Sequence, residues 1–597
     1  MQKVLKREEV QKEYTWALED FYESNEKCRE DIQLLEGKIE EFLACKGNLG
    51  ESGESLKTAL DAYFTLAQNL EKVYVYAAQK LHQDMGNGAQ QNLEKSAQIL
   101  MNKFYAAVSF MEPEILTIPE ETLKSWIQEV PGMELYGYFL ENILKEKAHT
   151  LDEKTEELLA RAREIGEAPS NIFAMFNNAD VRFEDVTDKD GQKHPLTVGL
   201  YGNYIKSKDR ELRKSAMENL YKVYRQFTNT LSAAFDANLR SADFFAKEHR
   251  YGSAREASLA ANHIPVPVYD NLLEAVNKNL PLLHRYMDIR KKALNLSELH
   301  MYDLYVPMVG DVDGEYSFEE AKEIVRKALV PLGEDYLELL EKGFSERWID
   351  VYENEGKRTG AYSWGVYGVH PYVLLNYHGS LHDVFTLAHE MGHSMHSWYS
   401  NHKQPYAYSQ YSIFVAEVAS TLNEALLIHY LLKNSKDQTE RAYLVNYFLE
   451  QFRTTLYRQT MFAEFERDAH AMVNEGGALT AETLNELYGN LNKKYFGENV
   501  ICDPEISYEW SRIPHFYTPF YVYQYSTGFS AAIAISNKIL KGEEGIVEKY
   551  KEFLSGGSSM TPIELLRICG VDMESREPVE SALEVFREYL DEMEKLL

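Results

Sequence analysis

The sequence feature that most constrains this chain is the run His389-Glu390-Met391-Gly392-His393, which has the form H-E-x-x-H. On a helix, two histidines four residues apart project from one face, so their imidazoles can share one metal ion. Glu390 follows the first histidine directly, and a carboxylate at that position can take a proton from a water bound to the metal. The pattern therefore predicts a helix that carries two metal ligands and a general base.

The residues around this motif also favour a helix. Ser380 and Asp383 have the spacing of a capping box, which predicts that the helix begins there. Apolar residues follow at helical spacing, namely Val384, Phe385, Leu387, Ala388, Met391 and Met395. Gly392 is the exception, because glycine in a helix interior costs about 1 kcal/mol relative to alanine. A missing side chain between two ligands predicts that another backbone, or a substrate, passes close to the helix.

Composition narrows the class of protein. The chain has 597 residues, of which 45% are hydrophobic and 26% charged, as in an ordinary globular protein. Its net charge of -31 argues against nucleic acid and anionic membranes as partners. The four cysteines show no C-x-x-C spacing, the N-terminal segment lacks the apolar core of a signal peptide, and no apolar run approaches the roughly 18 residues that span a bilayer. We therefore expect a cytoplasmic protein, with its oligomeric state left open.

Hydrophobic periodicity predicts a mainly α fold. Apolar residues recur at helical spacing in much of the chain, for example in residues 55–81, 93–111 and 413–433. Alternating residues around Asp188-Lys-Asp-Gly191 predict a β-hairpin, and we place a domain boundary near this point. Short strands are predicted just before the metal-binding helix, at residues 348–352, 360–364 and 372–377. A strand edge beside a metal site can bind an extended peptide through main-chain hydrogen bonds.

Two histidines are too few for a catalytic zinc site, which needs three protein ligands and a vacancy for water. The metzincin pattern would place Gly at 396 and His at 399, but the chain has His396 and Tyr399, so this pattern is excluded. We expect His396 to pack or to support a ligand. The next helix offers Glu417 and Glu424 on one face, seven residues apart. One of them can bind metal while the other supports a histidine, and spacing alone does not choose between them.

The segments His389-Glu-Met-Gly-His-Ser-Met-His396 and Phe414-Val-Ala-Glu417-Val-Ala-Ser420 resemble the thimet oligopeptidase and oligoendopeptidase F family of zinc peptidases. The oligoendopeptidase F branch is the closer match, and it is also resembled by Gly368-Val-His-Pro-Tyr372, Pro514-His-Phe-Tyr517 and Tyr523-Gln-Tyr-Ser-Thr-Gly528. The N-terminal third resembles the family only in helical character and length. The resemblance implies one Zn²⁺ per chain, held by His389, His393 and Glu417, with Glu424 as a supporting acid.

The resemblance also implies a fold and a set of substrates. The fold would be a mainly α, bowl- or clam-shaped metallopeptidase of two lobes, with a deep substrate channel and a small β-sheet beside the metal-binding helix. Residues 1–195 would form an N-terminal helical lobe and residues 196–597 the zinc metallopeptidase catalytic domain. Substrates would be short oligopeptides, a size limit that comes from the family alone.

A peptide hydrolase also needs donors for the tetrahedral oxyanion, aimed at the place where negative charge develops. Residues 515–525 hold one histidine and four tyrosines. The resemblance implies that His515 and Tyr523 are these donors, with Tyr517 next. Tyr521 and Tyr525 lie in the same segment, so the choice of phenol stays open.

The sequence thus predicts a zinc endopeptidase that hydrolyses internal bonds of oligopeptides, with Glu390 activating the water. One alternative is a metallocarboxypeptidase of similar helical build, which would need a clamp for a free C-terminus. Another is a non-catalytic peptide-binding protein with a structural zinc. Glu390 argues against the second alternative, because a structural site prefers four closed protein ligands and has no use for a base.

Overall fold

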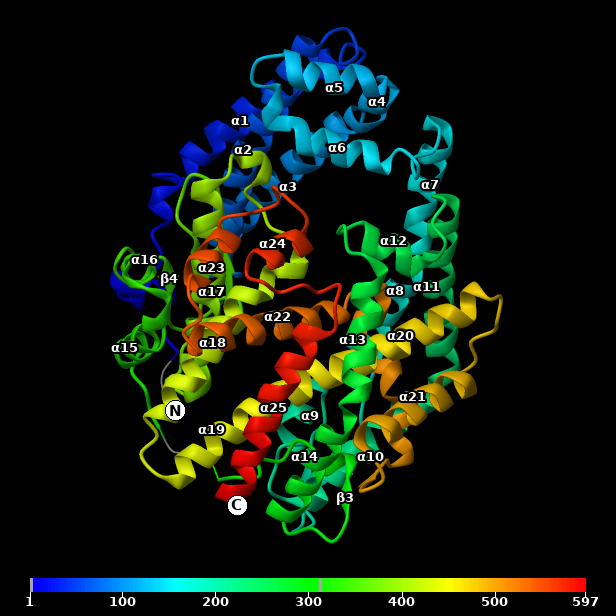
Figure 1. The fold of residues 1–597 in the computed structure, drawn as a ribbon, viewed down its shortest axis with the longest axis vertical. Helices are drawn as coiled ribbons and strands as arrows, with labels where there is room; N and C mark the ends of the chain where they lie inside the picture. The colour runs from blue at the N-terminus through cyan, green and yellow to red at the C-terminus, as the bar shows by residue number, and fades with distance from the viewer. Residues whose placement is uncertain (1–3, 311–313) are drawn as a thin grey trace. The chain divides into compact units, whose positions relative to one another are not determined.

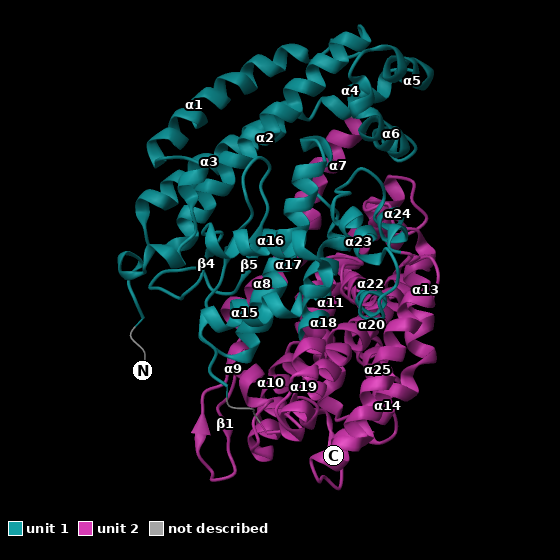
Figure 2. Ribbon diagram, turned by 60° about the vertical axis from the view of Figure 1, so that its left-hand side comes forward, with its two compact units in different colours: residues 1–150, 314–427, 535–569 teal, residues 151–313, 428–534, 570–597 magenta. Residues whose placement is uncertain are grey.

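The computed structural model describes residues 4–310 and 314–597, and most of them lie in helices joined by short turns (Figure 1). The predicted mainly α class with small sheets is confirmed. Within these residues, no helix is both long and apolar enough to cross a membrane. The chain forms two compact units, coloured separately in Figure 2. Unit 1 comprises residues 1–150, 314–427 and 535–569, and unit 2 comprises residues 151–313, 428–534 and 570–597. Each of these units combines three segments of the chain, whereas the predicted domains, residues 1–195 and 196–597, are each one continuous segment. The predicted division stays a prediction.

Unit 1 begins with a group of helices that pack through a shared apolar core. These are α1 (Asn25–Phe42), α2 (Gly53–Gln83), α3 (Gly88–Val108), α4 (Met111–Thr117), α5 (Glu120–Glu129) and α6 (Gly137–Glu146). Ser52 ends the preceding loop and caps α2, since its side chain accepts a hydrogen bond from the backbone N–H of Ser55. Leu60 and Leu70 of α2 pack in this core with Leu93 of α3. Helical periodicity predicted these elements correctly in the segments 55–81 and 93–111.

A three-stranded sheet of unit 1 precedes the metal-binding helix. Its strands are β4 (Ile349–Asp350), β5 (Tyr362–Trp364) and β6 (Tyr372–Leu374), in the order β4-β6-β5. β4 pairs with β6 in parallel and β5 pairs with β6 antiparallel, so β5 is an edge strand. The N-terminal segment contacts β4, the strand at the other edge of the sheet, because the guanidinium of Arg7 donates hydrogen bonds to both carboxylate oxygens of Asp350. The predicted strands are therefore confirmed, although each is shorter than expected.

Among the remaining helices of unit 1, one packs on this sheet and others pack on that helix or on its neighbours. The remaining helices are α15 (Phe318–Ala328), α16 (Glu334–Ser345), α17 (Leu381–Lys403), α23 (Ile546–Leu554) and α24 (Pro562–Ile568), with the first part of α18 (Ile413–Lys433). α17 carries the H-E-x-x-H motif. Its capping box is confirmed, since Ser380 Oγ accepts from the backbone N–H of Asp383, and Asp383 accepts from the backbone N–H of Ser380.

Unit 2 is also helical. Its first helices are α7 (Glu153–Gly166), α8 (Ala168–Met175), α9 (Val198–Tyr204), α10 (Arg210–Gln226), α11 (Thr228–Glu248), α12 (Ala254–Ala260), α13 (Val266–Lys278) and α14 (Leu280–Ala293). Later come α19 (Gln438–Gln451), α20 (Arg458–Asn474), α21 (Ala481–Phe496), α25 (Glu577–Leu596) and most of α22 (Tyr523–Leu540). The predicted hairpin is confirmed as β1 (Val186–Thr187) paired with β2 (Lys193–His194), and Gly191 takes a positive φ in its turn. A parallel pair is formed by β3 (Leu299–His300) and β7 (Val500–Ile501).

Candidate metal centre and active site

Three side chains of unit 1 bring their ligand atoms together on α17 and α18. His389 Nε2 lies 3.2 Å from His393 Nε2. Glu417 Oε2 lies 3.5 Å from the first of these nitrogens and 3.6 Å from the second. The group His389, His393 and Glu417 is the one set of three metal-ligating side chains with atoms this close among the described residues.

These separations fit a small tetrahedral ion. Zinc–nitrogen and zinc–oxygen bonds of about 2.0–2.1 Å at tetrahedral angles place neighbouring ligand atoms about 3.3–3.4 Å apart. The three observed distances fall within a few tenths of an ångström of that value. The donor set of two imidazoles and one carboxylate is also that of catalytic zinc sites with three protein ligands. The residues therefore fit a zinc ion with one position left for water.

Glu424 touches the first histidine from the opposite side of its ring. His389 Nδ1 lies 2.5 Å from Glu424 Oε1. A carboxylate can only accept, so Nδ1 donates the proton, which leaves Nε2 available as the ligand nitrogen. Burial lowers the pKa of His389, but the hydrogen bond and the charge of Glu424 outweigh it and raise the pKa to about 9. This carboxylate thus fixes the orientation and the basicity of the imidazole.

Glu390 is buried next to the ligands with one carboxylate oxygen unpartnered. Its side chain is 6% exposed, and Oε2 has no hydrogen-bond partner among the described residues. Burial raises its pKa, His389 lowers it, and the charges of Glu417 and Glu424 raise it again, to about 7. A carboxyl group with a pKa close to neutrality can both accept and return a proton. Glu390 therefore keeps one carboxylate oxygen that no hydrogen-bond donor of the described residues occupies.

The missing side chain of Gly392 lets two helices approach closely. A Cβ at this position would lie 2.6 Å from the Cα of Ser420, 2.7 Å from the carbonyl oxygen of Ala419 and 2.8 Å from its carbonyl carbon. The predicted neighbouring backbone is therefore that of α18. A second contact reinforces the crossing, since Asn423 Nδ2 donates to the carbonyl of Ala388 at 3.1 Å. The crossing holds Glu417 one helical turn from the contact point and so fixes its distance from the histidines.

Strand β5 contacts the same helix through residues that sequence reasoning missed. Ser363 Oγ lies 2.8 Å from Ser394 Oγ of α17, and the backbone of Ser363 lies close enough to Glu390 to lower the pKa of its carboxyl group. No local pattern marks Ser363, because its role depends on how the strand lies across α17. The edge strand thus runs directly beside the candidate base.

His396 lies behind the metal centre and packs against aromatic rings. Its imidazole stacks on Tyr411 with centroids 3.6 Å apart and planes within 3°. Burial lowers its pKa to about 3, and neither ring nitrogen has a partner among the described residues. The structure therefore places His396 in the packing and outside the ligand group.

The predicted oxyanion donors belong to unit 2. The imidazole of His515 is exposed and lies near the rings of Tyr521 and Tyr525, with centroids 6.1 and 6.0 Å away. Tyr523 is buried against Tyr269, with centroids 5.0 Å apart, and Tyr517 stacks on Phe173. The structure therefore groups His515 with the two phenols that the resemblance ranked lower.

A buried acid holds the backbone just before these tyrosines. Glu466 Oε1 accepts a hydrogen bond from the backbone N–H of Phe520 at 2.6 Å. Phe520 has a positive φ of 55°, which is unusual for a residue with a side chain. Burial raises the pKa of Glu466 to about 8, against the effect of the Phe520 N–H. Sequence reasoning missed this acid, because nothing in the pattern around residue 466 indicates its partner.

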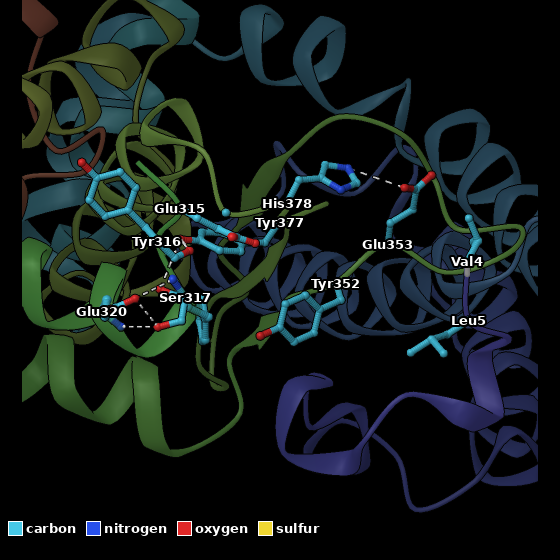
Figure 3. Close-up of a pocket in the computed structure, with 12 residues that line it drawn as sticks. Val4, Leu5, Glu315, Tyr316, Ser317, Glu320, Tyr352, Glu353, Tyr377 and His378 are labelled. Carbon is cyan, nitrogen blue, oxygen red and sulfur yellow. Dashed lines mark hydrogen bonds and ion pairs between the residues drawn. The ribbon is translucent and has the colours of Figure 1, made fainter. Parts of the chain in front are cut away.

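A cavity of about 750 Å³ opens near the N-terminal end of α17, away from the ligand group (Figure 3). Its lining includes Tyr352 and Tyr377, and Glu353 faces His378 across 3.5 Å. None of the described residues that line it is a predicted ligand or catalytic residue. This cavity is therefore separate from the ligand group.

Comparison with known proteins identifies the family. The model of peptidase family M3 matches residues 203–585, and the oligopeptidase F model matches residues 114–183. The chain belongs to peptidase family M3. It is 48% identical to oligopeptidase PepF of Bacillus subtilis over 99% of this chain and 88% of that protein. It is 41% identical to an oligoendopeptidase F homolog of Lactococcus lactis over 99% of this chain and 98% of that protein.

Solved structures agree with this family. The crystal structure of oligoendopeptidase-F from Enterococcus faecium is 40% identical and has a TM-score of 0.75, over 95% of this chain and 98% of that chain. A solved protein from Chlamydophila abortus is 36% identical, with a TM-score of 0.93 over the whole of both chains. The resemblance seen in the sequence is confirmed, and the protein is a family M3 peptidase of the oligoendopeptidase F type that acts on peptides.

Proposed function

We propose that this M3 peptidase is a zinc-dependent endopeptidase that hydrolyses internal bonds of short oligopeptides. The observation that carries the proposal is the convergence of His389 Nε2, His393 Nε2 and Glu417 Oε2 at 3.2–3.6 Å, beside the unpartnered oxygen of Glu390. When bound by these three side chains, one zinc ion per chain would lower the pKa of a water ligand and polarise a peptide carbonyl.

The residues of this chain then have distinct roles. Glu390 accepts the proton of the attacking water and returns it to the leaving amine, since it lies buried beside the ligand group with one carboxylate oxygen unpartnered. Glu424 keeps His389 in the tautomer that offers Nε2. The edge strand β5 would orient an extended substrate by main-chain hydrogen bonds beside the base. His515 and Tyr523, with Tyr517 next, are the proposed oxyanion donors, and Tyr521 and Tyr525 are alternatives because they lie near His515.

The family resemblance supports two further features of this function, the restriction to short peptides and a closed substrate channel. A cytoplasmic location stays a prediction.

Cleavage mapping tests the proposed activity. Peptides of graded length, acetylated at the N-terminus and amidated at the C-terminus, would be incubated with the purified chain and the products identified by mass spectrometry. We expect internal cleavage of the short peptides and resistance of long ones. Cleavage that requires a free C-terminal carboxylate and removes terminal residues would favour the metallocarboxypeptidase. Zinc binding with no cleavage of any peptide would favour the peptide-binding protein.

A further inference from the structure

A second cavity, of about 330 Å³, lies wholly within unit 2 and carries an excess of positive charge. The charged residues in its lining are Lys206, Arg458, Arg512 and Glu509. The lining thus carries three cationic groups and one acid. The two arginine side chains are mostly buried, at 14% and 20% exposed, whereas Lys206 is exposed.

The one acid in this cavity accepts four hydrogen bonds. Glu509 Oε1 accepts from Arg458 Nη2 and Arg512 Nη2, both at 2.7 Å, and from the hydroxyl of Tyr221 at 3.2 Å. Its Oε2 accepts from the hydroxyl of Tyr488 at 2.6 Å. Burial raises the pKa of Glu509, but the two guanidinium groups outweigh it and hold the pKa at about 2. Glu509 is therefore ionised in all ordinary conditions and neutralises only one of the two arginines.

Donors remain on both guanidinium groups. Nε and Nη1 of Arg458 and Nη1 of Arg512 have no acceptor among the described residues, and none of these atoms is sealed from solvent. A guanidinium presents its N–H groups as a planar fork that matches the two oxygens of a carboxylate. Both arginines therefore keep unpartnered N–H donors in the wall of one cavity, and these donors point to an anionic ligand.

Apart from Asn203 and Gly202, the rest of the lining is apolar or aromatic. Met217, Leu304 and Ile506 are buried there. The ring of Tyr201 lies 5.6 Å from the guanidinium of Arg512. Because Glu509 is already paired with both arginines, the described lining offers no unpaired carboxylate for an ammonium group. The ligand that fits is thus negatively charged at one end and apolar at the other.

We propose that this cavity binds a monocarboxylate with a compact apolar substituent, its carboxylate on Arg458 and Arg512. Such a group is either the C-terminal residue of a peptide or a free branched short-chain acid, and both share the chemistry that the cavity recognises. The site is separate from the metal centre of unit 1, so its existence does not depend on the proposed zinc chemistry.

Two glycines of α9 provide a matched pair of test variants. Gly202 lines the cavity, and a Cβ built on it meets no atom within 4 Å. Gly202→Phe would therefore place a ring in the cavity without removing a charged residue. Gly199 lies on the same helix outside the cavity lining, and a Cβ there meets only Thr197 Oγ1, at 3.9 Å. Gly199→Phe is the control for the effect of an added ring on the helix.

The experiment is calorimetric titration of the full chain, in chloride-free buffer, with isovalerate, N-acetyl-L-leucine and the neutral isovaleramide. We expect one acid molecule per chain, amide binding weaker by about tenfold or more, loss of acid binding in Gly202→Phe and normal binding in Gly199→Phe. Binding of N-acetyl-L-leucine would show that the site accepts the C-terminal residue of a peptide. Binding of isovalerate without N-acetyl-L-leucine would show that the site accepts a free short-chain acid. Equal binding of acid and amide, no binding of either acid, or normal binding by a folded Gly202→Phe variant would overturn the proposal.

A second variant decides the matter if Gly202→Phe does not fold. Arg458→Lys keeps the positive charge beside Glu509 but loses the planar fork. We expect this variant to fold and to bind the acid more weakly by about tenfold. Unchanged acid affinity in Arg458→Lys would contradict the assigned carboxylate contact.

Discussion

Gly392→Ala is the substitution that most sharply separates ligand geometry from fold stability. The new Cβ would lie 2.6 Å from the Cα of Ser420 and 2.7 Å from the carbonyl oxygen of Ala419. Carbon atoms in contact normally lie about 3.5–4.0 Å apart, so the two helices would have to separate by about 1 Å. The atoms in the way belong to backbone and cannot rotate aside. Because Glu417 lies one turn before Ser420, this shift would move it away from both histidines.

The expected effects differ greatly in size. Alanine stabilises a helix interior by about 1 kcal/mol relative to glycine, whereas overpacking costs about 1–3 kcal/mol. The free energy of unfolding should therefore fall by no more than about 2 kcal/mol. A ligand displaced by about 1 Å can reduce activity by about 100-fold. We accordingly expect a folded protein with weaker metal binding and a large loss of kcat/KM.

The assay combines metal content, peptide hydrolysis and thermal unfolding on the same preparation. Gly37→Ala is the matched control, since Gly37 lies within α1 and a Cβ there meets no atom within 4 Å. That variant should gain about 1 kcal/mol in stability at unchanged activity. Wild-type metal content and wild-type kcat/KM in Gly392→Ala would refute the claim that this helix crossing sets the ligand geometry.

Further substitutions test the assigned roles. Glu390→Ala should keep zinc and lose turnover, and full turnover would remove the assigned base. Glu417→Ala should lose zinc measured by mass spectrometry while Glu424→Gln keeps more of it; the reverse order would exchange ligand and supporting acid. Tyr523→Phe should lower kcat more than it raises KM, and a change confined to KM would make Tyr523 a substrate contact. Burial raises the pKa of Glu466 to about 8 in the folded protein, whereas its ordinary value, taken for the unfolded chain, is 4.5. Between these two pH values the unfolded chain loses this proton first, so the free energy of unfolding falls as the pH rises from 4.5 to 8. The free energy of unfolding of Glu466→Gln should therefore exceed that of the wild type by about 3 kcal/mol at pH 7 but by little at pH 4.5. An equal difference at both pH values would contradict this.

Local sequence patterns predicted the two helices that carry the candidate metal ligands, because caps and apolar spacing depend only on residues close together in the chain. The capping box of Ser380 and Asp383 placed the start of α17. Apolar spacing placed α18 at Ile413–Lys433, the bounds that the structure shows. The absent side chain of Gly392 indicated a close neighbour without identifying it, and the structure shows that neighbour to be α18.

Features that depend on the approach of distant segments were not predictable. Glu417 and Glu424 lie on one face of α18, so spacing could not tell which of them faces Nε2 and which faces Nδ1 of His389. Only the crossing angle of the two helices separates these roles. The contact of Ser363 with Glu390 likewise follows from a strand lying across a helix. Arg7 and Asp350 are 343 residues apart in the chain, and no pattern in either segment indicates their pairing.

The proposed zinc site can be tested by X-ray absorption at the zinc edge, measured on purified active enzyme. We expect one zinc per chain, bound by two imidazole nitrogens and by oxygen ligands at about 2.0–2.2 Å, with activity lost on chelation and restored by zinc. Full activity in a preparation that holds no metal and resists chelators would contradict the proposal.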